Sequence, residues 1–368
     1  MKIALLANLK ENAPTWDGIA SDRWDDLDSP ATTDAIADAL RAGGHTVDFF
    51  EAQIKPPYNL VENLTAFNPD LCFNITESHF GDSREAQIPA LLDMLEIPYT
   101  GSRVLTLTLA LDKPMTKRVL RYHDLPTPEF QVFESVNDPI DRDLINEDGE
   151  LRLPLFVKPS REGTSVGISA HSIVRNIADL YEVVEEQLMR YRQPILVEHY
   201  IEGRELTVGV VGNLGRIVAR CINDRDLPEE LPSTLHFLPI LEIDTLAYDQ
   251  TEGGLYTNRI KTDLVDKFYY SCPAPIDAGL AHRLKVLTAA VFRVTGCKDV
   301  ARVDFRLDAL TGTPYILEIN PLPGLNPDYS DLCIQAYENG WTYSQLVNRI
   351  ANEALQRHGM LEKINISG

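Results

Sequence analysis

The stretch that decides the fold reads Arg302-Val303-Asp304-Phe305-Arg306-Leu307, then a turn-like run over residues 308–314, then Tyr315-Ile316-Leu317-Glu318-Ile319-Asn320. In both outer segments polar and apolar residues alternate with a period of two, which is typical of a half-buried β-strand. The two segments therefore predict a β-hairpin folded about Thr311. Its apolar face would pair Val303 with Ile319 and Phe305 with Leu317.

The polar face of this hairpin carries an unusual pairing of charges. In the predicted register Asp304 lies opposite Glu318, and Arg302 lies opposite Asn320. Two carboxylates directly opposite each other destabilise a sheet unless a cation lies between them. Two carboxylates and a carboxamide, with no nearby Cys or His, suit magnesium or manganese that carries substrate phosphates. The alternative is an amphipathic hairpin whose polar face is simply solvated.

Composition excludes several classes of partner. The chain has 368 residues, 44% hydrophobic and 24% charged, which is typical of a globular protein of two or three domains. Its 34 basic and 55 acidic residues give a net charge of -21, which argues against a nucleic-acid surface or an anionic membrane patch. Any phosphate site must therefore be built locally.

Cysteine use and hydropathy point to an intracellular protein. The five cysteines are scattered, without a C-x-x-C pair, which is typical of reduced thiols in the cytoplasm. The apolar start is too short for a signal peptide, and no run of about 18 apolar residues is present. We expect a cytoplasmic protein that does not enter a membrane.

The first hundred residues alternate strand and helix patterns, which predicts an open, parallel α/β domain. Strands are expected at residues 3–7, 45–50 and 71–75, and helices at 32–41 and 85–95. No G-x-G-x-x-G follows the first strand, so dinucleotide binding there has no support. Between Glu11 and Asp28 lies an acidic loop with two tryptophans; we interpret it as a solvated connection, with a functional segment as the alternative.

From about residue 105 the order of expected helices and strands changes. Asp112 can cap a helix from Lys113 to about His123. Further strands are expected at residues 153–158, 166–169, 195–201, 205–211 and 216–221, and further helices at 172–190, 277–295 and 344–358. Residues 223–267 show no clear period, which predicts loops and a candidate substrate lid.

Two segments carry candidate chemistry. Residues 156–169 predict a strand, a small polar loop and a second strand, so that Gly163, Thr164 and Ser165 could wrap phosphate oxygens while Lys158 supplies charge. The same loop also spells G-x-S-x-G, but a serine hydrolase needs a helix directly after the serine, and the segment that follows is a poor helix start.

Residues 195–206 predict a strand, a turn at Glu202-Gly203 and a return strand. Glu198 and Glu205 are carboxylates within these apolar strands, and they need donors such as ribose hydroxyls, an amino group or a lysine. Each could instead be an acid on an exposed face.

Six ordered motifs resemble the D-alanine–D-alanine ligase branch of the ATP-grasp superfamily, from about Leu71 onward. They are residues 111–113, 157–167, Val197-Glu198 to Glu205, 272–274, 302–304, and 318–320 through Pro323-Gly324. The resemblance implies an α/β fold in which an N-terminal open parallel α/β domain (residues 1–104) precedes a two-domain ATP-grasp fold, with a central subdomain (105–200) and a C-terminal subdomain that carries the metal site (201–368).

The resemblance also implies roles for individual residues. Lys113 and Lys158 would contact the phosphates of ATP, and Gly163, Thr164, Ser165 and Val166 would form the loop that closes over them. Glu198 and Glu205 would hold the adenosine, and Lys261 would reach the γ-phosphate. Asp304, Glu318 and Asn320 would bind two magnesium (or manganese) ions, and Arg302 with the Gly324 amide would stabilise an oxyanion.

The substrate pocket departs from the family pattern. Where the family has a glycine-rich turn and a glutamate for the ammonium of the first amino acid, this chain has residues 7–14, in which Glu11 is the candidate substitute. The family's His-Gly becomes Ser78-His79-Phe80-Gly81, and Ser330 matches the substrate-carboxylate serine only with one residue of extra length.

We therefore expect an ATP-dependent ligase that joins a carboxylate to an amine through an acyl phosphate, acting on small molecules other than two D-alanines. A true D-alanine–D-alanine ligase of peptidoglycan synthesis and a non-catalytic ATP-binding homologue are the alternatives. For the oligomeric state, a homodimer is the candidate.

Overall fold

The computed structural model describes residues 1–215, 230–244 and 270–361. Its first sheet has three parallel strands in the order β2-β1-β3, namely β1 (Lys2–Ala7), β2 (Thr46–Glu51) and β3 (Leu71–Asn74). The open parallel sheet expected from the sequence is therefore confirmed.

Three α-helices accompany this sheet, and the sequence predicts two of them. Helix α1 (Pro30–Ala42) begins at Ser29, whose side chain accepts from the Thr32 amide, and it ends at Gly43. Helix α2 (Leu60–Phe67) and helix α3 (Gln87–Met94) follow; the short 3₁₀ helix η1 (Lys10–Asn12) lies between β1 and α1, and η2 (Arg84–Ala86) directly precedes α3. The sequence missed α2.

The second sheet is antiparallel, with four strands in the order β4-β7-β5-β6. The strands are β4 (Phe130–Phe133), β5 (Leu155–Pro159), β6 (Ile173–Val174) and β7 (Ile195–His199); helix α6 (Ile177–Tyr191) and the turns η3 (Arg142–Leu144) and η4 (Ala170–Ser172) complete the unit. The strand expected at residues 166–169 is absent there, because Thr164, Ser165 and Gly167 adopt positive φ and the segment turns.

The third sheet has six strands, with the path β11-β10-β8-β12-β13 and with β9 also on β8. They are β8 (Gly203–Gly212), β9 (Leu235–Phe237), β10 (Leu241–Ile243), β11 (Tyr270–Ser271), β12 (Val300–Asp308) and β13 (Pro314–Asn320). Five of the described helices accompany the third sheet: α4 (Val104–Leu111), α5 (Lys113–Tyr122), α10 (Ala278–Thr295), α11 (Asp331–Glu338) and α12 (Tyr343–Arg357). The strand expected at residues 216–221 lies outside the described residues.

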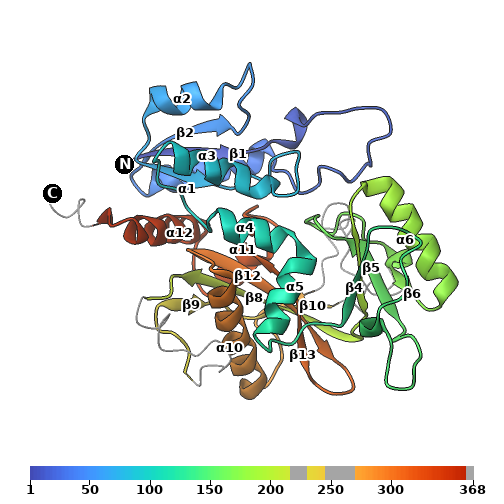
Figure 1. Cartoon of the computed structure of the whole chain (residues 1–368). Helices are drawn as coiled ribbons and strands as arrows, with labels where there is room; N and C mark the ends of the chain where they lie inside the picture. The colour runs from blue at the N-terminus through green and yellow to red at the C-terminus, as the bar shows by residue number, and fades with distance from the viewer. Residues whose placement is uncertain (216–229, 245–269, 362–368) are drawn as a thin grey trace.

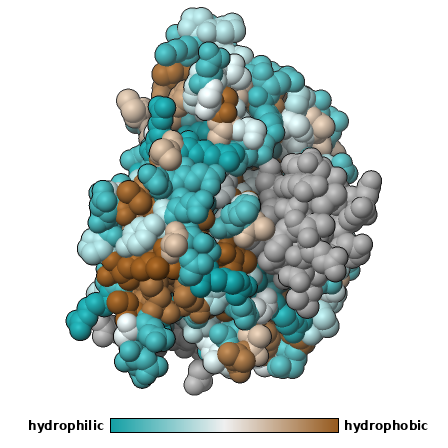
Figure 2. Space-filling model, turned by 90° about the vertical axis from the view of Figure 1, so that its right-hand side faces the viewer, coloured by the Kyte–Doolittle hydropathy of each residue, from teal (hydrophilic) through white to brown (hydrophobic). Residues whose placement is uncertain are grey.

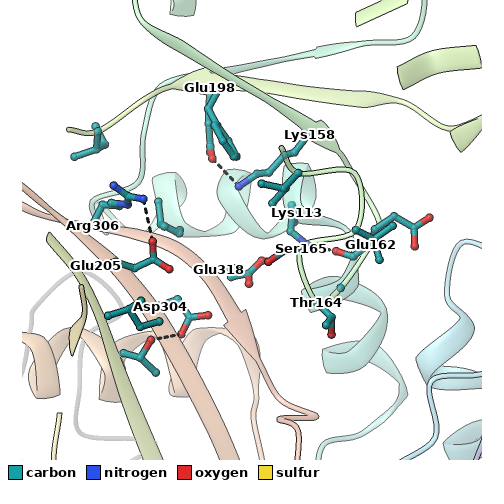
Figure 3. A pocket seen from close by; sticks show the side chains of 18 of the residues that line it. Lys113, Lys158, Glu162, Thr164, Ser165, Glu198, Glu205, Asp304, Arg306 and Glu318 are labelled. Carbon is teal, nitrogen blue, oxygen red and sulfur yellow. Dashed lines mark hydrogen bonds and ion pairs between the residues drawn. The ribbon is translucent and has the colours of Figure 1, made fainter. Parts of the chain in front are cut away.

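The hairpin expected between residues 195 and 206 does not form. Strand β7 pairs with β4 and β5 in the second sheet, whereas β8 pairs with strands of the third. The chain therefore crosses from one sheet to the other near Gly203, and Glu198 and Glu205 lie on different walls of the space between the sheets (Figure 3). Local patterning could not reveal this, because each strand alone has the same period whichever partner it takes.

The hydrophobic cores cross the expected boundaries at residues 104 and 200. Figure 1 shows α12 running beside α1, and Val347 and Ile350 of α12 share a core with Ile3 and Ile36 of the first unit. Ala110 and Leu120 pack with the third sheet and α10. The three sheets follow one another along the chain, but the division into segments stays a prediction.

On the face drawn in Figure 2, hydrophilic side chains are widely spread and hydrophobic ones gather in the lower half. None of the described helices is long and apolar enough to cross a bilayer.

The crossing at Gly203 gives a test of the fold. Gly203 has φ +152°, and a Cβ there would lie 1.9 Å from the Leu307 carbonyl oxygen. We expect Gly203→Ala to destabilise the protein by about 2–5 kcal/mol, because it combines backbone strain with a clash against a rigid carbonyl. The matched control is Gly312→Ala, which also has positive φ (+65°) but open space, and should cost about 1 kcal/mol. Equal losses in urea unfolding would contradict this explanation.

Candidate active site

One wall of the space between the second and third sheets carries a buried triad of charges. Lys158 lies on β5, Glu198 on β7 and Lys117 on α5. The Glu198 carboxylate contacts Lys158 Nζ and Lys117 Nζ at 2.6 Å each. Figure 3 shows Lys158 pointing toward Glu198 across the top of the cavity.

Burial and pairing compete in this triad. Burial by itself raises the pKa of Glu198, but the two lysines outweigh it, so the pKa lies below its usual value. Burial lowers the pKa of Lys117 to about 8, although Glu198 opposes the shift. Lys158 therefore enters the cavity as part of a charge network rather than as an isolated cation.

The loop after β5 is a tight turn. Val166 N donates to the Gly163 carbonyl at 2.9 Å, and Thr164 and Ser165 have φ values of 46° and 60°. No helix follows Ser165 directly, since α6 begins only at Ile177. The strand–turn–helix geometry of a nucleophile elbow is absent, so the hydrolase alternative loses its structural requirement.

Lys113 joins this loop to the opposite wall. It is the first residue of α5, which Asp112 caps by accepting from the Met115 amide at 3.0 Å, as the sequence predicted. Lys113 Nζ donates to the Glu162 carbonyl at 2.6 Å and lies 3.3 Å from Glu318 Oε2.

The hairpin of β12 and β13 forms the opposite wall, with much of the expected register. Arg302 pairs with Asn320, Val303 with Ile319 and Asp304 with Glu318, as predicted. A bulge after Asp304 then shifts the pairing, so that Phe305 meets Ile316 instead of Leu317. Ile316 enters the core, while Leu317 lines the cavity.

The donor set of this face fits a hard cation. Asp304 accepts from Thr207 Oγ1 at 2.8 Å, from Arg302 at 3.0 and 2.9 Å, and from Asn320 Nδ2 at 2.9 Å. The Glu318 carboxylate lies opposite Asp304 in the sheet and is partly exposed to the cavity. Asp304 lines the first cavity, Asn320 lines the adjoining one and Glu318 lines both, and two carboxylates with a carboxamide match the oxygen ligands that magnesium prefers.

Glu205 lies on the third sheet, across the cavity from Glu198. Arg306, its neighbour in the β8–β12 register, contacts it at 3.0 Å and also lies over the Tyr200 ring. The cavity holds about 940 Å³ of empty space that opens to solvent, and it is lined by Lys113, Lys158, residues 163–166, Glu198, Glu205, Arg302, Asp304 and Glu318 among others.

A second cavity adjoins the first. Lys113, Glu162, Gly163, Thr164, Arg302, Glu318 and Asp331 line both. The second cavity also receives Asn320, Gly324 and Ser330. Ser330 Oγ accepts from the Asn326 amide at 2.9 Å, and Arg302 is held between Asp304 and Asp331 at 2.9 and 3.0 Å.

Comparison with known proteins decides the family. Residues 119–226 and 240–352, more than half of the chain, match the family model described as the D-Ala–D-Ala ligase C-terminus. The D-alanine–D-alanine ligase of Bordetella avium is 31% identical over 319 residues, which are 87% of each chain. The chain belongs to the D-alanine–D-alanine ligase family of ATP-grasp enzymes.

Two further matches agree. The uncharacterized protein y4sG of Sinorhizobium fredii is 32% identical over 333 residues, 88% of each chain. The crystal structure of the Bacillus anthracis D-alanine–D-alanine ligase complexed with ATP superimposes with a TM-score of 0.68 over 97% of this chain and 98% of that one; at 21% identity this shows a shared fold. As a family member, the protein is a D-alanine–D-alanine ligase-like enzyme that forms a C–N bond. Ligases of this family use ATP and divalent metal ions.

Glu11 does not lie where the family resemblance suggested. It is exposed on η1 and lines neither cavity. The side chains that reach the second cavity from the first unit are instead Asp25, Asp26, Asp28, Glu77 and Glu85. Lys261 lies outside the described residues.

The loop over residues 11–28 is not a solvated connection. Trp24 is 8% exposed and packs edge-on against Trp16 and His79. Asp22 accepts from the Gly167 amide at 3.1 Å and from Tyr191 at 2.9 Å, and Arg23 pairs with Glu162. The loop therefore fastens the first unit to the segment that follows β5, whereas its functional role stays a prediction.

Sequence reasoning missed several residues of the site. Lys117 could have been found, because it stands four residues after Lys113 and so shares its face of the expected helix. Arg306 could have been found as the charged residue two positions after Asp304 on the same strand face. Glu77 follows the end of a parallel strand, an edge where α/β sheets commonly bind ligands.

The triad makes a testable prediction about stability. Glu198→Gln leaves Lys117 and Lys158 buried without their shared counter-charge, so we expect a loss of about 3–5 kcal/mol at pH 7. The control Glu129→Gln breaks a half-exposed pair with Arg121 and should cost about 1 kcal/mol or less.

The loss should depend on pH. In the folded protein the pKa of Lys117 is about 8, below its ordinary value of 10.5. Between pH 8 and pH 10.5 the unfolded state therefore binds more protons at this group than the folded state does. The free energy of unfolding contributed by Lys117 consequently rises with pH in that range. Without Glu198 the folded pKa falls further, and the penalty of the variant should shrink by about 1 kcal/mol from pH 7 to pH 9. Urea unfolding at the two pH values measures it; a penalty that stays constant or grows contradicts the coupling.

Proposed function

We propose that this enzyme uses ATP to activate a carboxylate as an acyl phosphate and then joins it to an amine. The observation that carries the proposal is that two cavities meet at Lys113, Arg302 and Glu318. A γ-phosphoryl group at the end of the first cavity would face a carboxylate in the second. In-line transfer needs this kind of juxtaposition.

The first step moves the phosphoryl group. A carboxylate oxygen attacks the γ-phosphorus, the bond to the β–γ bridging oxygen breaks, and ADP leaves. Lys113, Lys158 and the amides of Gly163 to Val166 would neutralise and hold the phosphates, and Lys261 remains the proposed γ-phosphate lysine. Ser165 would act within the closing loop. Asp304, Glu318 and Asn320 would hold one or two Mg²⁺ (or Mn²⁺) ions, which supply further charge neutralisation.

The second step forms the amide. The amine attacks the acyl carbon, the carbonyl oxygen becomes an oxyanion, and inorganic phosphate then leaves as the carbonyl re-forms. Arg302 is held by Asp304 and Asp331, and its pKa lies above its ordinary value, so it stays cationic. Arg302 and the Gly324 amide would stabilise the oxyanion, and Ser330 would bind a substrate carboxylate. Glu198 and Glu205 would hold the adenosine from opposite walls.

The identity of the two substrates is part of the proposal. The relatives named D-alanine–D-alanine ligase favour the alternative of a true D-alanine–D-alanine ligase for peptidoglycan synthesis. Against it, Glu11 lies outside the second cavity, which is lined by a different set of acids. We therefore propose other substrates. A non-catalytic homologue is disfavoured, because the lysines, carboxylates and Arg302 of a ligase converge on one site.

We also propose that the enzyme acts in the cytoplasm, where ATP is available and the four free cysteines of the described chain would stay reduced. The segments 1–104, 105–200 and 201–368 would act as the three domains. A homodimer stays an open prediction.

Isotope transfer tests the acyl phosphate directly. With a carboxylate substrate labelled with ¹⁸O on both oxygens, one labelled oxygen should appear in each inorganic phosphate released, because that oxygen attacks the γ-phosphorus. Mass spectrometry of the phosphate measures it. Unlabelled phosphate accompanying amide formation would falsify the acyl-phosphate route.

The metal assignment predicts a second result. Glu318→Gln removes a charge opposite Asp304 without changing the size of the side chain, so ADP formation at millimolar magnesium should fall at least about 100-fold while the fold is kept. The control Glu147→Gln changes an exposed acid of the second unit and should keep full activity. Near-normal turnover by a folded Glu318→Gln enzyme contradicts the assignment; circular dichroism checks the fold.

A further inference from the structure

The second cavity carries far more negative than positive charge. Among the described residues, eight carboxylates and two cationic side chains line it. The carboxylates are Asp25, Asp26, Asp28, Glu77, Glu85, Glu162, Glu318 and Asp331, and the cations are Lys113 and Arg302. The cavity opens to solvent, so small molecules can reach these side chains.

Five of these carboxylates already have counter-charges. The pairs are Asp25 with Lys10, Asp26 with Arg84, Glu162 with Arg23 and Arg84, Glu318 with Lys113, and Asp331 with Arg302. Arg84 has a structural task in addition, since it donates to the Arg161 carbonyl at 2.7 Å. These five therefore need no ligand to be stable.

The other three carboxylates have no such partner. Asp28, Glu77 and Glu85 make no side-chain hydrogen bond and no ion pair with any described residue. Glu85 is only 9% exposed. One oxygen of Asp26 is buried without a hydrogen-bond partner, although its side chain is 4% exposed. Buried carboxylates without partners are costly.

Nearby cations compensate these acids only in part, since Arg84 acts on Glu77 and Glu85 and Lys113 acts on Glu85, but burial outweighs them. Burial raises the pKa of Asp28 and of Glu85 to about 7 each, and burial with the neighbouring acids raises the pKa of Glu77 well above its ordinary value. These groups would ionise fully once a cation lies beside them.

Asp28, Glu77 and Glu85 come from three separate segments of the cavity wall, which suits several separate cationic groups. Two neutral amino acids would bring one ammonium group, because the amine that attacks must be unprotonated. One ammonium cannot neutralise three carboxylates on different segments of the cavity wall.

We propose that the second cavity takes a substrate with at least two amino groups, a basic amino acid or a diamine, and that Asp28, Glu77 and Glu85 bind its ammonium groups. The inference rests on the ligase function proposed above, for which it names the substrate class. Paired charge of this kind discriminates strongly, because a neutral analogue leaves the buried carboxylates unpaired.

Binding measurements test the charge preference without turnover. With magnesium and a non-hydrolysable ATP analogue, calorimetry compares both enantiomers of lysine, the diamine cadaverine, and norleucine, which has an uncharged chain of similar length. We expect lysine or cadaverine to bind at least about tenfold more tightly than norleucine, and their relative affinities distinguish an amino acid from a diamine. Equal affinities for lysine, cadaverine and norleucine overturn the proposal.

Substitutions test which carboxylates cause the preference for charged amines. Glu85→Gln should remove most of the preference, and Glu77→Gln should reduce it, while Asp17→Asn, an exposed acid of the same N-terminal loop, should leave it unchanged. At pH 8, where most of Glu85 is ionised, Glu85→Gln should also raise the Tm of the ligand-free protein, because it removes a buried charge that has no ion-pair partner. A merely structural glutamate would lower Tm instead. Unchanged preference in both glutamate variants overturns the assignment.

Turnover separates this inference from the ligase function. The best-binding amine is offered with ATP, alone and with a panel of carboxylates, and ADP is measured. Release of ADP with neutral amino acids at the same kcat/KM as with lysine leaves the ligase function standing and overturns this inference. Tight, charge-dependent binding of the amine without ADP release under any condition supports the inference and contradicts the ligase function.

Discussion

The double pairing of strand β12 is the constraint on which the site depends. β12 pairs with β8 along residues 300–308 and with β13 on its other side, so its register is set twice. A slip of one residue would turn Asp304 into the core and Val303 into the cavity. Because both partners agree on the register, Asp304 and Glu318 are held facing each other, and Arg306 is held beside Glu205.

Ion pairs between protein side chains hold the charged groups of the cavity in place. Lys117 and Lys158 share Glu198, Lys113 lies beside Glu318, and Arg302 lies between Asp304 and Asp331. Each pair keeps a buried charge from standing alone, which would be costly.

The N-terminal loop contacts the segment after β5 and also lines the second cavity. Asp22 and Arg23 fasten it to Gly167 and Glu162 near the phosphate loop, and residues 25–28 line the second cavity.

The sequence by itself determined the parallel first sheet, the capped start of α5 and the Asp304–Glu318 pairing, because period-two alternation, Asx caps and short hairpins are local properties. Only the tertiary structure decided the bulge that brings Leu317 into the cavity, the crossing at Gly203 that separates Glu198 from Glu205, and the anchoring of the tryptophan loop. It also excluded Glu11 from the second cavity and brought Glu77 and Glu85 there instead. The physical reason is that burial and strand partners depend on contacts between residues far apart in the chain, and local patterning carries no information about which distant segment supplies them.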